Sequence, residues 1–147
     1  MKRILTVCVG NICRSPVAAA VLREHLPNYK VASAGIAAVV GSDVDPSARE
    51  AAEAAGVVVG EHAARQFTRE IGEQYDLILV LEGGHKREIE RIAPELSGRV
   101  MRLTRWNGEA DIPDPYRRNT EFHTYVFALI EEAATAWVSR LSPMKPG

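Results

Sequence analysis

The stretch "ILTVCVGNICRSP", residues 4–16, begins as an apolar run and ends in a segment that contains both cysteines of the chain. The apolar run has the valine, leucine and isoleucine content of a strand that is buried on both faces. Pro16 suits the first position of a helix, and Ser15 before it suits the N-cap. The stretch therefore predicts a strand, a tight loop and a helix in direct succession.

The rest of the chain repeats this alternation of short apolar runs and longer segments with helical periodicity. It predicts four strands, at residues 3–9, 29–34, 76–81 and 99–103. Further helices are expected at 45–56 and 68–74, capped by Asp45 and Thr68, at 84–93, and from Thr120 to Leu141. The order indicates an α/β fold, with helices packed on a parallel sheet through right-handed crossovers. Ligands of such folds bind beyond the carboxyl ends of the strands, which is where the first loop lies.

Composition favours one compact domain over residues 1–147, with a flexible tail at 142–147. Of the 147 residues, 46% are hydrophobic and 25% are charged, as in an ordinary globular domain. The 18 basic and 19 acidic residues give a formal charge of -1, so we expect no nucleic-acid partner. No apolar run approaches the roughly 20 residues of a membrane span, and no export signal is recognisable. We therefore expect a cytoplasmic protein without membrane insertion, in which the cysteines are thiols.

The first loop has the composition of an anion site. Gly10 and Asn11 are residue types that readily take left-handed backbone angles, which allows successive N–H groups to face one centre. The following helix N-terminus adds positive potential, and the Arg14 guanidinium can bind two phosphate oxygens. The same field favours a thiolate at Cys8, a candidate nucleophile to which Ser15 can donate a hydrogen bond. The predicted phosphate loop around Cys8 and Arg14 comprises Val9, Gly10, Asn11, Ile12, Cys13 and Ser15.

Each of these residues also has a purely structural interpretation. A cysteine at the end of an apolar strand most often packs in the core, while Asn11 suits an ordinary turn and Ser15 a helix cap. Cys13 either packs or forms a reversible disulfide with Cys8 that shields an oxidised nucleophile. The combination of Cys8, Arg14 and Ser15 at one strand-to-helix junction favours the chemical interpretation. No GxxxxGK[ST] sequence occurs, which excludes a nucleotide-type phosphate loop.

The pattern Cys-x5-Arg-Ser at residues 8–15 resembles the low-molecular-weight protein-tyrosine phosphatases. The similarity extends through "SAGI" (33–36), "VVGSDVDPSA" (39–48), "HAARQF" (62–67), "YDLILVLE" (75–82) and "DIPDPYR" (111–117). It is greatest with bacterial members that work beside tyrosine autokinases in capsule and exopolysaccharide export. The resemblance implies a four-stranded parallel sheet of order 2-1-3-4 in a single domain. It also implies cofactor-free hydrolysis of phosphotyrosine in a partner protein, such as a bacterial tyrosine autokinase, by an enzyme that we expect to be a monomer.

The resemblance further implies a general acid. Tyrosinate leaves poorly, because its conjugate acid has a pKa of about 10, so a proton donor is required. The family's Asp-Pro-aromatic pattern falls on Asp114, which Pro113 and Pro115 stiffen on either side. Without that pattern, Asp111 and Asp114 would both be ordinary loop residues.

The resemblance also implies supporting roles for three more residues. Tyr116 and Val39 are expected to line opposite walls of the substrate pocket, with the Tyr116 ring stacked against the substrate ring. His62 matches the family histidine that hydrogen-bonds the loop asparagine, here Asn11. All three are predictions about position that a structure can examine.

Other functions fit part of the pattern. An arsenate reductase uses a similar loop but needs further cysteines, and none follows Cys13. A thiol redox protein would need neither Arg14 nor an acid, and a non-catalytic phosphotyrosine-binding module would lack the nucleophile or the acid. A metal site could be drawn from Cys8, Cys13, His62 and His85, although Cys-x4-Cys is not a usual zinc spacing. A phosphatase without a metal remains the main prediction.

Overall fold

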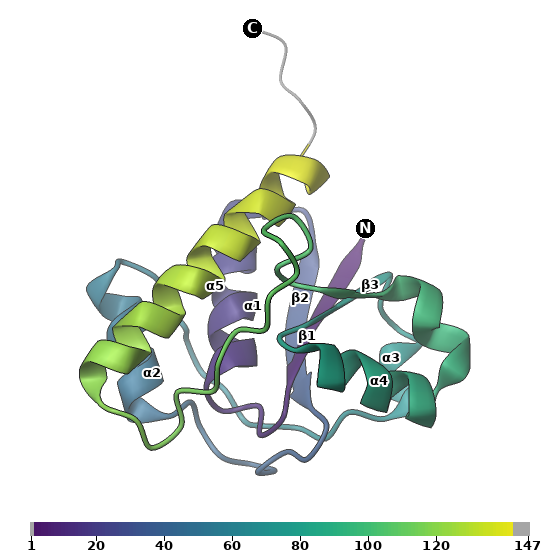
Figure 1. The fold of residues 1–147 in the computed structure, drawn as a ribbon, viewed down its shortest axis with the longest axis horizontal. Coiled ribbons are helices and arrows are strands. Elements are labelled where there is room, and N and C mark those ends of the chain that lie inside the picture. Colours follow the sequence, from purple (N-terminus) through teal and green to yellow (C-terminus); the bar gives the residue numbers. More distant parts are fainter. Residues whose placement is uncertain (1, 143–147) are drawn as a thin grey trace, which may run out of the picture.

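The computed structural model describes residues 2–142 and contains one sheet of four parallel strands (Figure 1). The strands are β1 (Arg3–Cys8), β2 (Lys30–Gly35), β3 (Leu77–Val80) and β4 (Val100–Arg102). Their spatial order is β2-β1-β3-β4, so the predicted strand order and parallel pairing are confirmed. Of the predicted tail, Ser142 caps the last helix, and 143–147 lie outside the described residues.

Helices cover both faces of the sheet. They are α1 (Arg14–His25), α2 (Pro46–Ala54), α3 (Arg69–Gly72), α4 (Gly83–Ile92), the 3₁₀ helix η1 (Pro94–Arg99) and α5 (Thr120–Leu141). In Figure 1, α1, α2 and α5 lie on one side of the strands, and α3 and α4 lie on the other. Both predicted ends of α5 are confirmed, whereas η1 was not predicted.

The central strand β1 explains why two layers of helices are needed. Ile4 and Cys8 pack into the core under α1 and α5, while Leu5 and Val7 pack into the core under α4. All four side chains are at most 3% exposed. A strand covered on both faces requires an uninterrupted apolar run, which is the signal that "ILTV" carries.

Side-chain caps fix where three helices begin. Asp45 accepts hydrogen bonds from two backbone N–H groups at the start of α2, and Thr68 accepts one at the start of α3, as predicted. Asn119 caps α5 in the same way. Gly56 follows the end of α2 with a φ of 82°, which ends the helix at little steric cost.

The start of α1 differs from the prediction. The helix begins at Arg14, and its N-cap residue is Cys13, whose side chain makes no capping hydrogen bond. Ser15 therefore lies inside the first turn, and its hydroxyl contacts Cys8 and Asn11 instead of helix N–H groups. Pro16 is still accommodated, because N–H groups of the first turn have no partner within the helix.

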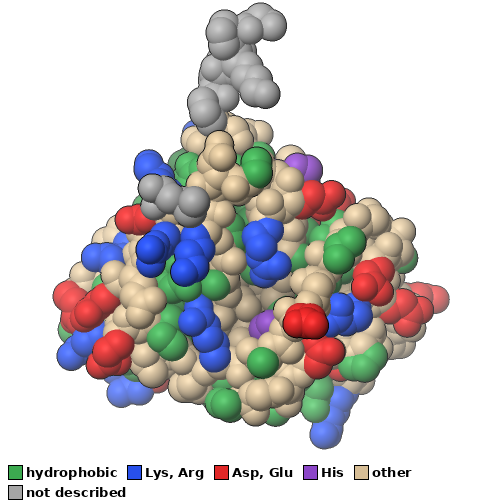
Figure 2. All heavy atoms as spheres, turned by 180° about the vertical axis from the view of Figure 1, so that it is seen from behind, with side chains coloured by type: hydrophobic (Ala, Val, Ile, Leu, Met, Phe, Trp, Pro, Cys, Tyr) green, Lys and Arg blue, Asp and Glu red, His purple; other side chains and the backbone are tan. Residues whose placement is uncertain are grey.

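The carboxyl ends of the strands face the lower edge of the molecule in Figure 1, where the loops after β1 and β2 and the segment before α5 come together. The face turned away in that view carries acidic and basic side chains interspersed with apolar atoms (Figure 2). No helix within residues 2–142 is long and apolar enough to cross a membrane. The loops at the lower edge contain the predicted site.

Candidate active site

The loop between β1 and α1, residues 9–13, is fixed by Asn11, which is fully buried. Its Nδ2 donates hydrogen bonds to the hydroxyls of Ser15 and Ser33, both at 2.9 Å, and its Oδ1 accepts one from the backbone N–H of Arg65 at 3.0 Å. The φ of Asn11 is 58°, a left-handed angle that costs an L residue energy and persists because these bonds over-determine it. The prediction that Gly10 shares this conformation is wrong.

Two contacts from outside complete the loop. The Nε2 of His62 lies 2.6 Å from the backbone oxygen of Asn11, so the predicted contact is present and Nε2 is the donor. Gly35 ends β2 beside the loop, where a Cβ would lie only 2.3 Å from the backbone oxygen of Val9. Within the described part of the chain, the N–H groups of residues 10–13 donate to no protein acceptor and are free to bind an anion.

Cys8 lies beside this loop at the end of β1, with 3% of its surface exposed. Its Sγ is 2.9 Å from the hydroxyl oxygen of Ser15. Because Asn11 donates to that oxygen, the hydroxyl proton of Ser15 is available to the sulfur, which is nearer than the other acceptor, the Ala34 carbonyl at 3.4 Å. A hydrogen bond donated in this direction stabilises a thiolate.

Arg14 is buried, and two groups from distant segments hold it. Its Nη1 donates to Oε2 of Glu82 at 2.5 Å and to the backbone oxygen of Ile112 at 2.7 Å. Nη2 is 3.9 Å from Oδ2 of Asp114, and neither Nη2 nor Nε donates a hydrogen bond to any residue that the structure describes. These two nitrogens are the edge of the guanidinium that remains for phosphate oxygens.

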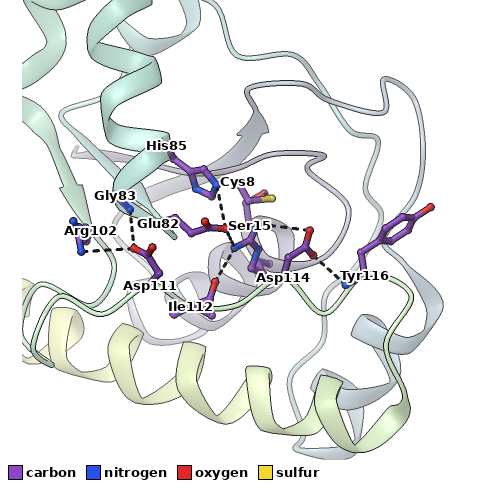
Figure 3. A network of polar contacts seen from close by, with 11 residues as sticks. Cys8, Ser15, Glu82, Gly83, His85, Arg102, Asp111, Ile112, Asp114 and Tyr116 are labelled. Carbon is purple, nitrogen blue, oxygen red and sulfur yellow. Dashed lines mark hydrogen bonds and ion pairs between the residues drawn. The ribbon is translucent and has the colours of Figure 1, made fainter.

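Asp114 belongs to the segment between β4 and α5, where it lies beside Tyr116 (Figure 3), and its Oδ2 is the carboxylate oxygen 3.9 Å from Arg14 Nη2. One carboxylate oxygen accepts a hydrogen bond from the backbone N–H of Tyr116 at 3.0 Å, and half of the side chain is exposed. Asp111 lies away from the pocket and accepts a hydrogen bond from the backbone N–H of Gly83. Of the two aspartates, only Asp114 lines the pocket.

The pocket has a volume of about 220 Å³ and brings most of the predicted residues together. Val39 and Tyr116 are both partly exposed at its mouth, as predicted for its walls. Asn11, Ser15 and His62 do not line the pocket but hold the loop through hydrogen bonds. The residues that line the pocket are Cys8, Val9, Gly10, Ile12, Cys13, Arg14, Ala37, Val39, Asp114 and Tyr116.

Two buried groups near the pocket have shifted pKa values. Burial, together with the carboxylates of Asp45 and Asp114, raises the pKa of the Cys13 thiol, so Cys13 is protonated at neutral pH. Burial and the nearby Arg14 charge lower the pKa of His85, so the imidazole is neutral at that pH. Cys8 and Cys13 are both free thiols.

The groups that hold Arg14 were not predicted from the sequence. Glu82 follows directly after β3, and Nε2 of His85 lies 3.5 Å from the same Glu82 oxygen that Arg14 contacts. Ile112 contributes only a backbone oxygen, which no side-chain pattern can indicate. A carboxylate directly after a buried strand, at the ligand-binding edge of a parallel sheet, was the available signal for Glu82.

The alternative metal site has no support in this geometry. Among residues 2–142, no group of three or more His, Cys, Asp and Glu side chains is placed to hold a metal ion. His62 contacts the backbone of the loop, and His85 contacts Glu82, so the two histidines serve different parts of the site.

A family model described as low molecular weight phosphotyrosine protein phosphatase matches residues 3–145. The chain belongs to this family. The low-molecular-weight protein-tyrosine-phosphatase Wzb of Escherichia coli K12 is 43% identical over 141 residues, which are 96% of each chain. The solved structure of Vibrio vulnificus Wzb in complex with benzylphosphonate is 47% identical, with a TM-score of 0.93, and the match covers 95% of this chain and 99% of that one. The YwlE arginine phosphatase from Geobacillus stearothermophilus is 30% identical, with a TM-score of 0.90 and coverage of 96% and 93%.

Membership of the low-molecular-weight phosphatase family confirms the resemblance carried by the Cys-x5-Arg-Ser pattern. The family is one of cysteine-dependent phosphatases, so the main prediction fits and the alternatives of a reductase, a redox protein or a binding module do not. In this low-molecular-weight phosphatase, the pattern surrounds the same pocket that Asp114 reaches from the other side.

Proposed function

We propose that this protein hydrolyses phosphotyrosine in proteins through a phosphocysteine at Cys8. The observation that carries the proposal is that Cys8, Arg14 and Asp114 line one pocket. A nucleophile, a phosphate ligand and a proton donor are therefore within reach of one bound phosphoryl group. Each side chain then has one task in a two-step transfer.

In the first step, the Cys8 sulfur attacks phosphorus and the bond to the tyrosine oxygen breaks. The free N–H groups of residues 10–13 and the open edge of Arg14 bind the three phosphoryl oxygens, whose charge is spread in the transition state. Asp114 gives its proton to the departing tyrosine oxygen, which leaves as neutral tyrosine. Because Glu82 and Ile112 hold Arg14 before substrate arrives, no reorganisation of the guanidinium is required.

In the second step, water attacks phosphorus and the bond to sulfur breaks. The Asp114 carboxylate accepts the proton of that water, and inorganic phosphate is released. The Cys8 thiolate is the leaving group, and the hydroxyl of Ser15, 2.9 Å away, stabilises the charge on the sulfur. The enzyme returns to its starting state without a cofactor.

The walls of the pocket favour an aromatic substrate. Tyr116 is 45% exposed and Val39 is 49% exposed, and both residues line the pocket. An aryl ring held between them adds stacking and apolar contact that a phosphoserine side chain cannot provide. The Wzb relative that binds benzylphosphonate, in which one CH2 group joins the phosphonate to a phenyl ring, supports this preference.

We propose a bacterial tyrosine autokinase of exopolysaccharide production as the protein substrate. The support is the similarity to Wzb phosphatases over nearly the whole chain. Val39 and Tyr116 are both about half exposed, so the mouth of the pocket faces solvent, from where we expect a phosphotyrosine in an extended tail to enter.

The test is hydrolysis of p-nitrophenyl phosphate and of a phosphotyrosine peptide in the presence of EDTA. We expect turnover by the reduced wild type and none by Cys8→Ser, with a phosphocysteine detectable by mass spectrometry after rapid acid quenching of the wild type. A peptide with phosphoarginine at the same position serves as the competing substrate, because YwlE is an arginine phosphatase. No turnover by the wild type, or a preference for phosphoarginine, would overturn the proposal.

A further inference from the structure

The segment that contains Asp114 is fastened to the rest of the molecule two and three residues earlier. Asp111 Oδ1 accepts a hydrogen bond from the backbone N–H of Gly83 at 2.8 Å (Figure 3). The backbone of Ile112 donates to the Leu81 carbonyl at 2.9 Å and accepts from Arg14 Nη1 at 2.7 Å. Ile112 is 1% exposed, so this attachment point is buried while Asp114 is not.

The hydrogen bond to Gly83 places Asp111 at the N-terminus of α4. Gly83 is the first residue of that helix, and the N-cap residue Glu82 makes no side-chain capping bond. Asp111 thus supplies the missing cap from another segment, where the helix dipole favours a negative charge. Because Glu82 precedes Gly83 directly and holds Arg14, the cap links both sides of the pocket.

Arg102, the last residue of β4, is the second group that contacts Asp111. Its Nη1 lies 3.6 Å from Asp111 Oδ1 and also donates a hydrogen bond to the backbone oxygen of Glu109. A Cβ on Gly83 would lie 2.4 Å from Nη2 of Arg102, so this guanidinium lies directly against position 83 and would have to shift if the residue there were larger. The two partners of Asp111 are therefore packed against each other.

Between this attachment and Asp114 the chain has little freedom. Pro113 locks its own φ angle near -65°, and Pro115 restricts the backbone of Asp114, the residue before it. Within the described residues, the backbone of residues 113 and 114 makes no hydrogen bond of its own. Apart from the contacts of its own carboxylate with Tyr116 and Arg14, the position of Asp114 therefore depends on how Asp111 and Ile112 are held.

We infer that Asp111 is a positioning residue for the general acid: by capping α4 and pairing with Arg102, it sets where the Asp114 carboxyl meets the leaving oxygen. The inference rests on the proposed function and adds a residue that does not touch the substrate. A group that acts only through Asp114 must lower kcat/KM, which reports the first step, most for the substrates whose leaving group most needs a proton.

The experiment compares Asp111→Ala with the wild type on phenyl phosphate and p-nitrophenyl phosphate, whose phenols differ in acidity. We expect the variant to lose about 10- to 100-fold in kcat/KM on phenyl phosphate, since displacement of a catalytic group by about 1 Å costs up to that much. We compare kcat/KM because kcat also contains the second step, which both substrates share. The loss on p-nitrophenyl phosphate is expected to be several-fold smaller, because its leaving group needs less protonation. Asp111→Asn keeps an oxygen for the Gly83 N–H and is expected to restore kcat/KM to within about threefold of the wild type, given that an exposed ion pair contributes little.

The decisive experiment introduces Asp111→Ala into the Asp114→Ala variant. There we expect Asp111→Ala to change the rates on the two substrates by the same factor. Thr68→Ala is the matched control, because it removes the cap of α3 far from the acid and is expected to leave the ratio of the two substrates unchanged. If Asp111→Ala does not fold, Asp111→Leu removes the same hydrogen-bond acceptor while keeping the bulk of the side chain, and the same ratio is measured.

Two outcomes would overturn the inference while the phosphatase function stands. One is that Asp111→Ala lowers activity equally on both substrates. The other is that Asp111→Ala shows the same dependence on the leaving group when Asp114 is already alanine. Absence of turnover by the wild type would instead remove the proposed function on which the inference rests. The two failures are distinguishable because wild-type turnover of p-nitrophenyl phosphate is measured in the same series.

Discussion

The two sides of the pocket are built in opposite ways. On the side of the phosphate loop, Asn11 and Ser15 are fully buried, Arg14 is 2% exposed, and all three make several hydrogen bonds to protein groups. On the other side, Asp114 and Tyr116 are about half exposed, and a hydrogen bond between them is their main polar contact. The buried side binds a phosphoryl group that is the same in every substrate, so rigidity helps at each turnover. The exposed side has to admit and release a protein segment.

Arg14→Lys changes the buried side of the pocket, and we expect it to lower turnover more than the substitutions that follow. An ammonium group cannot contact Glu82, Ile112 and two phosphate oxygens with the geometry of a guanidinium. We expect kcat/KM on p-nitrophenyl phosphate to fall by about 10³-fold, the upper range for removing a transition-state hydrogen-bond donor. Competitive inhibition by inorganic phosphate should weaken in parallel. The control is Arg49→Lys, which alters an exposed pair with Asp43, and comparable losses in both variants would mean that Arg14 has no special part.

Asp114→Ala changes the exposed side of the pocket, and we expect it to cause the second-largest loss of turnover. It removes the proton donor and leaves the phosphate loop intact, so the loss should depend on the substrate. We expect about a 10²-fold or larger fall in kcat/KM on phenyl phosphate and a smaller one on p-nitrophenyl phosphate. The slope of log kcat/KM against leaving-group acidity measures this dependence across a series of aryl phosphates, because kcat/KM reports the step in which the tyrosine-like oxygen leaves. An unchanged slope would show that the exposed side does not supply the proton.

The contrast between the two sides also marks what the sequence could predict. The buried side is formed largely by one contiguous stretch, so the roles proposed for Cys8, Arg14 and Ser15 followed from spacing at a strand-to-helix junction. Arg14 and Glu82 are 68 positions apart, and Gly83 and Asp111 are 28 apart, and nothing local in either segment indicates its partner. These contacts exist because parallel strands bring their carboxyl ends to one edge of the sheet.

Local preference failed where tertiary contacts outweighed it. Serine before proline is a good N-cap, yet Ser15 lies one residue inside α1 because Asn11 and Cys8 engage its hydroxyl. Glycine is the easiest residue to place at positive φ, yet the left-handed position falls on Asn11, where four hydrogen bonds hold the residue. Where no such competition exists, as at the caps Asp45 and Thr68, the predictions are confirmed.

Tyr116→Ala tests whether the exposed side selects the substrate. Loss of the ring removes one wall of the pocket, and a stacked aromatic pair is worth about 0.5–1.5 kcal/mol. We therefore expect kcat/KM on a phosphotyrosine peptide to fall by about twofold to tenfold, while Tyr116→Phe, which keeps the ring, stays near the wild type. Melting temperatures of both variants are expected to match the wild type, because the side chain is half exposed. An equal loss in the Phe variant would assign the effect to the hydroxyl and not to stacking.

Cys13→Ser is expected to have the smallest effect on turnover, although Cys13 lies on the buried side and lines the pocket. Burial and two carboxylates raise the pKa of its thiol, so at neutral pH it neither attacks phosphorus nor competes with Cys8 for the phosphoryl group. Its predicted part begins when peroxide oxidises Cys8 to a sulfenic acid: the Cys13 thiol then attacks that sulfur, a disulfide forms and water leaves. We expect kcat of Cys13→Ser within about threefold of the wild type, but recovery of activity by dithiothreitol after peroxide only in the wild type, since an unprotected sulfenic acid proceeds to irreversible acids. Equal recovery in both proteins would leave Cys13 with a packing role alone, and the buried side would then contain one residue that serves neither turnover nor protection.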